Sequence, residues 1–199
     1  MSQRRLPRHG ETMFLETLDE QNIFVIHGLL SPQECEQLVA RSEAIGYEAA
    51  AVGGELVPLL RNNDRAFLED PELARYLWQR VAPFLPATRD GCESTGLHER
   101  FRFYRYETAE YFAPHHDGCV DRGDSERSKL TFMVYLSDVD EGGATVFHGT
   151  GGVVRYEVQP ERGKALIFDH LQLHSGAPVL QGRKYVLRTD VMYRKLDNK

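Results

Sequence analysis

Residues 104–119 read Tyr-Arg-Tyr-Glu-Thr-Ala-Glu-Tyr-Phe-Ala-Pro-His-His-Asp-Gly-Cys, and the rest of the chain is organised around this stretch. Its centre is formed by His115, His116 and Asp117, which follow an aromatic segment. Side chains of an extended segment alternate between two faces, so His115 and Asp117 point one way and His116 points the other. One imidazole and one carboxylate are two of the three ligands of the two-histidine, one-carboxylate triad that holds non-haem Fe(II). The pair alone is also compatible with a charged surface loop.

Downstream of Glu99 the hydrophobic pattern has the period of two that is typical of β-strands. Strand candidates follow from this alternation at 101–106, 130–136, 144–147, 153–158, 164–168 and 184–193. Glycine-rich turns separate them, as at Glu141-Gly142-Gly143. Helices followed by many short strands favour an α+β fold with a sandwich or jelly-roll barrel.

Two helices are predicted before these strands. The first begins after Ser31, where Ser-Pro-Gln-Glu forms a capping box with proline at the first helical position, and it ends at Gly46. The second begins at Asp70-Pro71 and ends before Pro86. A short strand is expected at about 22–30. Residues 1–21 are expected to be loosely held, 47–60 to be strand or loop, and 87–97 to be a loop.

The bulk composition indicates an acidic globular protein. The chain has 199 residues, a formal net charge of −6 and 41% hydrophobic residues, which is compatible with one domain. Acidity argues against a nucleic-acid backbone as the main partner. Three widely spaced cysteines favour a reducing compartment, and no apolar run approaches the length of a membrane span. We therefore expect a cytoplasmic protein without a membrane or nucleic-acid partner; its oligomeric state stays open.

The third metal ligand should lie on a late strand, and both His170 and His174 satisfy that condition. Spacing alone does not choose between them. Further on, Lys184, Val186, Arg188 and Asp190 share one face of a predicted strand. A buried cation there needs an anion, which a dicarboxylic co-substrate could provide. The alternative is that Lys184 and Arg188 are exposed charges on an edge strand.

Three ordered motifs resemble the prolyl 4-hydroxylase type of 2-oxoglutarate- and Fe(II)-dependent dioxygenase. Tyr106, followed by Phe-Ala-Pro-His-His-Asp at 112–117, is similar to that family's first-ligand motif. Residues 131–147 are similar to its central strand pair, and residues 173–185, Leu-His-Ser-Gly-Ala-Pro-Val with the later Gly-Arg-Lys-Tyr, close the pattern. The resemblance covers about residues 100–194.

The resemblance implies a double-stranded β-helix, or jelly roll, with N-terminal helices packed on one sheet. We expect a single domain over residues 1–199, with a helical part at about 22–86 and a jelly-roll core at about 98–194. The iron ligands that the resemblance assigns are His115, Asp117 and His174. Lys184 would pair with the distal carboxylate of 2-oxoglutarate, with Tyr106 and Thr131 as further contacts. Arg188 could bind 2-oxoglutarate, bind substrate or pair with Asp190, and we expect Lys184 to be the main anchor.

The implied reaction needs Fe(II), 2-oxoglutarate and dioxygen, with ascorbate as a candidate reductant. It hydroxylates a substrate while 2-oxoglutarate is decarboxylated to succinate and CO2. The substrate would be a protein or peptide residue, proline among the candidates, or a small molecule. The last strand lacks the tryptophan that is common in collagen-type enzymes, and residues 107–110 lack a glycine that usually precedes the first ligand. Both departures count against proline in collagen as the substrate.

Substrate contacts are harder to predict. The polar run at 61–65 is most simply a solvated loop. The sharper hypothesis places it over the iron site, where Asn63 and Arg65, together with Tyr104, would contact substrate. Loops 47–68 and 118–128 are candidates for closing over the site.

Two other functions compete. A cupin-like metal-binding sensor or binding domain without turnover would share the jelly roll and the histidines, but it would not need Lys184 or Tyr106. A halogenase would lack the metal carboxylate, so Asp117 argues against that class.

Overall fold

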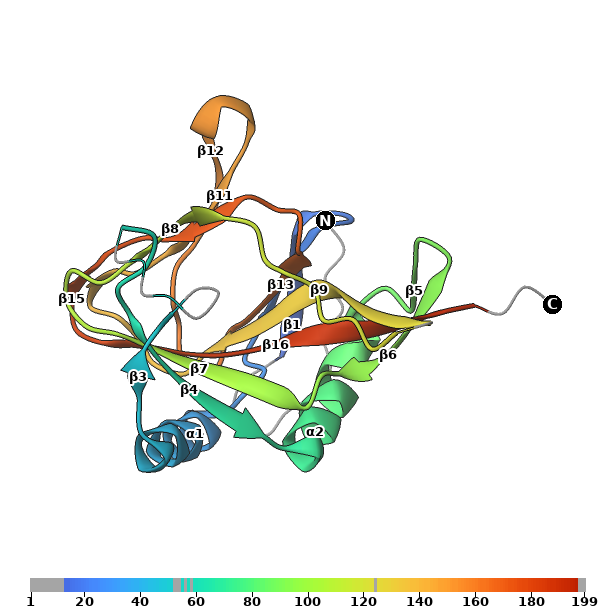
Figure 1. Ribbon diagram of the computed structural model, residues 1–199, viewed down its shortest axis with the longest axis horizontal. Helices are drawn as coiled ribbons and strands as arrows, with labels where there is room; N and C mark the ends of the chain where they lie inside the picture. Colours follow the sequence, from blue (N-terminus) through green and yellow to red (C-terminus); the bar gives the residue numbers. More distant parts are fainter. Residues whose placement is uncertain (1–12, 52–54, 56, 58, 124, 197–199) are drawn as a thin grey trace.

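The computed structural model describes residues 13–51, 55, 57, 59–123 and 125–196. In this part of the chain, a ten-stranded sheet and a four-stranded sheet form a mostly β fold, and α1 and α2 lie on the side of the large sheet that faces away from β8 and β11 (Figure 1). The main path of the large sheet is β1-β2-β13-β9-β16-β7-β4-β3, and the small sheet has the order β12-β11-β14-β8.

The elements have the following bounds. The large sheet contains β1 (Phe14–Asp19), β2 (Ile23–His27), β3 (Glu48–Ala49), β4 (Asp64–Glu69), β5 (Thr88–Arg89), β6 (Cys92–Leu97), β7 (Arg100–Tyr106), β9 (Glu126–Tyr135), β13 (Ala165–Asp169) and β16 (Lys184–Lys195). The small sheet contains β8 (Phe112–His115), β11 (Thr145–His148), β12 (Val154–Val158) and β14 (His174–Gly176). A two-stranded ribbon joins β10 (Glu141–Gly142) and β15 (Val179–Gln181). The helical elements are α1 (Pro32–Ile45), α2 (Pro71–Val81) and the 3-10 turns η1 (Ala82–Phe84) and η2 (Thr150–Gly152).

Both predicted helices begin where the sequence places their caps. The Ser31 hydroxyl accepts from the backbone N–H of Glu34, and the Glu34 carboxylate accepts from the backbone N–H of Ser31. These two bonds satisfy donors that a helix start otherwise leaves unpaired. The Asp70 carboxylate caps α2 in the same way, by accepting from the N–H of Leu73. Gly46 ends α1 with φ +88°, a conformation that favours glycine.

Strand alternation divides the core into two layers. Phe101 and Phe103 of β7 pack with the buried helix residues Leu38 and Leu77 on one face of the large sheet. The neighbouring Tyr104 and Tyr106 belong to the second cluster, which lies on the opposite face and includes Phe147 of the small sheet. The second layer is therefore where the large and small sheets meet. Side chains that point into this layer from both sheets can form a site between them.

Three segments differ from the expectation. Residues 14–19 form β1 because they pair with β2 and Phe14 stacks on His27, whereas residues 1–12 of the predicted loose segment lie outside the described residues. Residues 92–97 form β6, since they pair with the end of β16, although the sequence there lacks clear alternation. Residues 64–69 form β4, which pairs with β7. β1 is one arm of a hairpin with β2, whereas β6 and β4 take their conformation from partners far along the chain.

The N-terminal part is consequently more than a pair of helices. Strand β2 lies between β1 and β13, and β4 lies next to β7. The expected helical part at about 22–86 thus contributes strands to the same large sheet as residues 98–194. No helix among the described residues is long and apolar enough to cross a membrane.

Candidate active site

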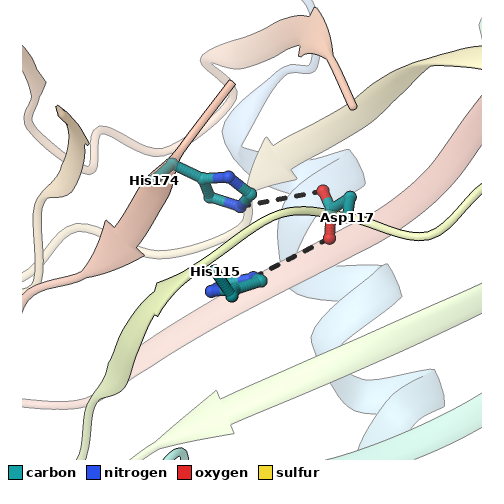
Figure 2. A group of neighbouring side chains, drawn as sticks. All are labelled: His115, Asp117 and His174. Carbon is teal, nitrogen blue, oxygen red and sulfur yellow. Dashed lines mark ion pairs between the residues drawn. The ribbon is translucent and has the colours of Figure 1, made fainter. Parts of the chain in front are cut away.

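Two strands of the small sheet bring the candidate metal ligands together. β8 and β14 pair so that His115 lies directly opposite His174. Asp117 follows two residues after His115, and one ligand atom from each of the three residues lies within 4.8 Å of the others. Figure 2 shows the three side chains converging, with Asp117 Oδ1 3.8 Å from His115 Nε2 and Asp117 Oδ2 3.7 Å from His174 Nε2. The structure therefore brings His174 into the cluster.

Backbone carbonyls orient both imidazoles. The Nδ1 of His115 lies 2.8 Å from the carbonyl oxygen of Ala113, and the Nδ1 of His174 lies 2.9 Å from that of Gln172. A carbonyl oxygen only accepts, so each Nδ1 carries the proton and each Nε2 keeps a free lone pair. Burial lowers the pKa of His115 to about 4 and also lowers the pKa of His174, despite the nearby Asp117 carboxylate. Both rings are therefore neutral at pH 7, the form that binds a metal.

Hydrogen bonds hold both oxygens of the Asp117 carboxylate. The Thr131 hydroxyl donates to Oδ2 at 2.5 Å, and Arg188 Nη2 lies 3.1 Å from Oδ1. Burial alone would raise the pKa of Asp117, but Arg188, His174 and the Thr131 hydrogen bond together hold it well below its usual range. Asp117 is thus an anion across the physiological pH range, and its position is fixed from two sides.

These donors fit an Fe(II) ion. Two neutral imidazole nitrogens and one carboxylate are the donor set of the non-haem iron triad. The protein supplies three ligands from one side, which leaves positions for other ligands on the open side. A cupin-like site would share these histidines, so the triad alone does not separate the competing functions.

Lys184 is the residue that distinguishes an oxygenase site from a cupin-like metal site. It is 2% exposed, its Nζ donates to the carbonyl oxygen of Gly143 at 2.8 Å, and it lies 4.2 Å from the centre of the Tyr106 ring. Burial lowers its pKa to about 7. Among the described residues, no carboxylate lies within ion-pair distance of Lys184. A buried ammonium group with only a carbonyl partner fits a site for an anionic ligand.

Lys184 and the triad line the same pocket. This pocket encloses about 470 Å³ of empty space, including its open mouth. Its lining residues are Tyr104, Tyr106, Phe112, His115, Asp117, Thr131, Met133, Thr145, Phe168, His174, Ser175, Gly176, Lys184, Val186 and Arg188. The edge-strand interpretation of Lys184 and Arg188 is wrong, because β16 lies between β9 and β7 and both side chains are buried.

Arg188 lies on the Asp117 side of the pocket. Its Nη2 contacts Asp117 at 3.1 Å and Asp190 Oδ1 at 3.3 Å. Burial alone would lower the pKa of Arg188, but the carboxylates of Asp117 and Asp190 raise it above the usual value. Of the three possibilities for Arg188, pairing with Asp190 is the contact that the structure contains. Of Lys184 and Arg188, Lys184 is the one that has no carboxylate within ion-pair distance among the residues that the structure describes.

The other histidines that the structure describes lie outside the ligand cluster. His170 is buried behind Thr131, with its Nδ1 3.0 Å from the Thr131 hydroxyl and its Nε2 2.8 Å from the Ser128 hydroxyl. His116 is exposed, as expected from strand alternation.

The polar run at 61–65 is not a solvated loop. Arg61 and Asn63 are buried, and Asn63 Oδ1 accepts from Arg61 Nε at 3.0 Å. The Arg61 guanidinium lies 4.2 Å from the Phe112 ring centre, and Phe112 stacks on His115 at 3.6 Å between ring centres. The run therefore lies beside the site, and the substrate contacts that the sharper hypothesis adds stay a prediction.

The three proposed substrate contacts occupy different positions. Tyr104 lines the pocket, Asn63 supports Arg61, and Arg65 lies outside the pocket lining beside Tyr104 on the neighbouring strand. Sequence reasoning missed the roles of Arg61 and Phe112. The available signal was only the position of Phe112 before His115, and nothing singled out Arg61 within the polar run at 61–65. Of the candidate closing loops, residues 52–54, 56, 58 and 124 lie outside the described residues.

Comparison with known proteins agrees with this geometry. Residues 101–189 match the family model described as the 2OG-Fe(II) oxygenase superfamily. Two probable prolyl 4-hydroxylases of Arabidopsis thaliana are 27% and 28% identical to the chain, each over 83% of its length. The matched region spans 67% of each of these relatives, about two thirds of their length.

Solved structures share the fold. A Pseudomonas putida prolyl-4-hydroxylase aligns with a TM-score of 0.64 and 18% identity, covering 89% of this chain and 94% of that one. A prolyl hydroxylase from Trichoplax adhaerens, solved with a hypoxia inducible factor peptide, aligns with a TM-score of 0.67 and 16% identity, covering 89% and 85%. A viral collagen prolyl hydroxylase from Paramecium Bursaria Chlorella virus-1, solved with 2-oxoglutarate, aligns with a TM-score of 0.61 and 23% identity, covering 91% and 100%.

The fold, the ligand cluster and the family match over residues 101–189 together support a 2-oxoglutarate- and Fe(II)-dependent oxygenase. The chain is similar to prolyl 4-hydroxylases, and the matching family model implies Fe(II), 2-oxoglutarate and dioxygen as cofactors. The non-catalytic cupin-like alternative is not favoured.

Proposed function

We propose that the protein hydroxylates a peptidyl proline, with His115, Asp117 and His174 as the Fe(II) ligands and Lys184 as the anchor for 2-oxoglutarate. The observation that carries this proposal is the shared pocket of the triad and the buried, carboxylate-free Lys184. The relatives named above, which are prolyl hydroxylases, support proline as the oxidised residue.

Hydrogen bonds hold each of the three proposed iron ligands in position. The Nδ1 hydrogen bonds to backbone carbonyls keep the imidazole lone pairs aimed at the metal position. Thr131 and Arg188 fix the Asp117 carboxylate. Bound iron supplies the activation of dioxygen, and the co-substrate supplies the electrons for it.

Lys184 recognises the far end of the co-substrate. Its Nζ lies beside Tyr106, so a carboxylate that enters this end of the pocket would meet an ammonium group and a phenol in a water-poor environment. A charge-assisted hydrogen bond there would be stronger than one at the surface. The 2-oxo acid end of the same molecule would then lie toward the triad.

Three further statements belong to the same proposal. The two sheets correspond to the double-stranded β-helix, or jelly roll, of this enzyme class, in one domain that includes the N-terminal helices. Ascorbate serves as a reductant that restores Fe(II). The protein acts in the cytoplasm, as the widely spaced cysteines suggest.

The proposal is tested with a panel of proline-containing peptides incubated with Fe(II), 2-oxoglutarate and air. We expect wild type to add one oxygen atom to proline, detected by tandem mass spectrometry, and His115→Ala to add none. Matched peptides with alanine in place of proline should remain unmodified. Oxidation of a free small molecule, with every proline peptide untouched, would contradict proline as the substrate.

A further inference from the structure

His170 is a buried histidine that the ligand cluster does not include. It follows directly after β13 and is 5% exposed. Each of its ring nitrogens has a hydroxyl partner, since Thr131 Oγ1 lies 3.0 Å from Nδ1 and Ser128 Oγ lies 2.8 Å from Nε2. Thr131 and Ser128 are themselves buried. Two satisfied nitrogens are compatible with a role in packing alone, so the direction of each hydrogen bond decides whether His170 does more.

The Asp117 carboxylate fixes this direction at one end. An ionised carboxylate only accepts, so the Thr131 hydroxyl donates its single hydrogen to Asp117 Oδ2 at 2.5 Å. The Thr131 oxygen can then only accept from His170, and Nδ1 of His170 must carry a hydrogen. Arg188 Nη2 lies 3.4 Å from the same oxygen and is also a donor. Two donors behind Thr131 therefore aim its hydroxyl at Asp117.

A backbone N–H fixes the direction at the other end. The N–H of Val120 donates to Ser128 Oγ at 2.8 Å, so the Ser128 hydroxyl keeps its hydrogen for Nε2 of His170. Burial lowers the pKa of His170, and a neutral ring that carries its hydrogen on Nδ1 accepts at Nε2. We call the resulting series of hydrogen bonds the His170 chain, and its members in order of donation are Val120, Ser128, His170, Thr131 and Asp117.

His170 also holds the backbone of Asp117. Its carbonyl oxygen accepts from the N–H of Asp117 at 3.1 Å. Its own N–H donates to the carbonyl oxygen of Lys129 at 3.3 Å, on the same strand that carries Thr131. One residue therefore contacts the main chain of Asp117 directly and the carboxylate of Asp117 through Thr131.

Loss of the His170 donor would leave the Thr131 hydroxyl weakly held. The Thr131 oxygen would keep only the longer contact with Arg188, at 3.4 Å, and its hydroxyl could turn away from Asp117. Arg188 would still pair with the other carboxylate oxygen, Oδ1, at 3.1 Å. Hydrogen bonds in a buried series also strengthen one another, so a break at His170 weakens the bond to Asp117.

We propose that His170 is a positioning residue of the metal centre, whose Nδ1–H holds the Thr131 hydroxyl in the orientation that donates to Asp117. The inference rests on the proposed role of Asp117 as an iron ligand, and it adds a residue that acts on this ligand from behind. His170 is not among the residues that line the pocket, so its effect reaches the metal position only through Thr131 and the backbone of Asp117.

Two variants separate positioning from packing. His170→Phe keeps a ring of similar shape and removes both nitrogens, whereas His170→Asn loses the ring but keeps an amide N–H close to the position of Nδ1. Mn(II) binding to metal-free protein is measured by calorimetry, and the stability of each metal-free variant by urea unfolding. We expect His170→Phe to bind Mn(II) about three- to tenfold more weakly than wild type, and His170→Asn to bind within about twofold of it. Packing alone predicts the reverse order, because phenylalanine fills the space better than asparagine.

Two further measurements test the route through Thr131. In a Thr131→Val background, His170→Phe should weaken Mn(II) binding no further, because the hydroxyl through which it acts is already gone. The tautomer is measured without any metal, by 15N NMR of the imidazole rings of wild type. The His170 ring, assigned by the loss of its signals in His170→Asn, should carry its hydrogen on Nδ1.

Wild-type Mn(II) affinity in folded His170→Phe would overturn the inference, as would additive effects of His170→Phe and Thr131→Val. If His170→Phe does not fold, a His170 ring with its hydrogen on Nε2, or tenfold weaker binding by His170→Asn, would overturn it instead. The proposed function fails separately: Mn(II) affinity that is the same in wild type and Asp117→Ala would reject Asp117 as a ligand and the inference with it. Binding that depends on Asp117 but not on His170 would reject the inference alone.

Discussion

Replacing Lys184 by methionine should change how the stability of the ligand-free protein depends on pH. The wild-type ammonium group is buried, and its pKa falls from 10.5 to about 7 on folding. Below pH 7, Lys184 is protonated in both states, and the native state carries the full cost of the buried charge. Between pH 7 and 10.5 the unfolded chain binds a proton that the native state has released, so this cost declines and the stability of wild type rises with pH.

The magnitude follows from the pKa difference. At ~1.36 kcal/mol per pKa unit, the full cost is about 5 kcal/mol, and about 2–3 kcal/mol of it disappears between pH 6 and pH 9. Methionine is similar in length, but it gives up the hydrogen bond to Gly143, which costs about 1–3 kcal/mol at every pH. Lys184→Met should therefore gain about 2–3 kcal/mol relative to wild type at pH 6 compared with pH 9.

Urea unfolding of metal-free protein at the two pH values measures this difference. Lys164→Met is the matched control, because Lys164 is also buried but has Glu161 as a partner at 2.8 Å. Its effect should be the same at both pH values. We also expect 2-oxoglutarate to raise the melting temperature of wild type and to leave that of Lys184→Met unchanged. A stability difference that does not change with pH, or an unchanged response to 2-oxoglutarate, would refute the reasoning.

Three further predictions concern the metal and the fold. Thr131→Val removes the 2.5 Å hydrogen bond to Asp117. It should weaken Mn(II) binding roughly 10- to 100-fold by calorimetry, because hydrogen bonds to charged groups contribute about 1.5–3 kcal/mol; equal affinity would argue against the role of Thr131. Since the pKa of His115 is about 4, its protonation should change Mn(II) affinity little between pH 7.5 and 5.5 and lower it only as the pH falls to 4 and below, whereas a tenfold loss by pH 5.5 would show an ordinary histidine. Gly163→Ala should lower the free energy of unfolding, measured in urea, by more than about 2 kcal/mol. Gly163 has φ +85°, and a Cβ there would lie 2.1 Å from the carbonyl oxygen of Leu30. An unfolding free energy equal to that of wild type would contradict that contact.

Local signals in the sequence predicted much of the fold. The capping box at Ser31 and the cap at Asp70 define both helix starts. Alternation located β7, β9 and β16, since their side chains face two different layers. β6 was missed, because its conformation depends on pairing with residues about a hundred positions away. Local propensity carries no information on such a partner.

Part of the site could likewise be predicted from local sequence signals, and part of it depends on contacts between distant segments. Alternation placed His115 and Asp117 on one side, but choosing His174 over His170 needed the family resemblance or the strand register. The position of Lys184 on an interior strand follows from the apolar residues around it. Arg61 could not have been predicted, because its contact with Phe112 joins segments 51 positions apart and involves a polar run without periodicity.

The most direct test of the account measures succinate formation from 2-oxoglutarate by anaerobically Fe(II)-loaded protein when air is admitted. Wild type, His174→Ala and Lys184→Ala are compared without added substrate, and 2-oxoglutarate binding is followed in parallel by iron absorbance. We predict succinate from wild type, none from His174→Ala, and succinate from Lys184→Ala only at much higher 2-oxoglutarate. Wild-type protein that forms no succinate and shows no change in iron absorbance on adding 2-oxoglutarate would contradict the assignment of the pocket.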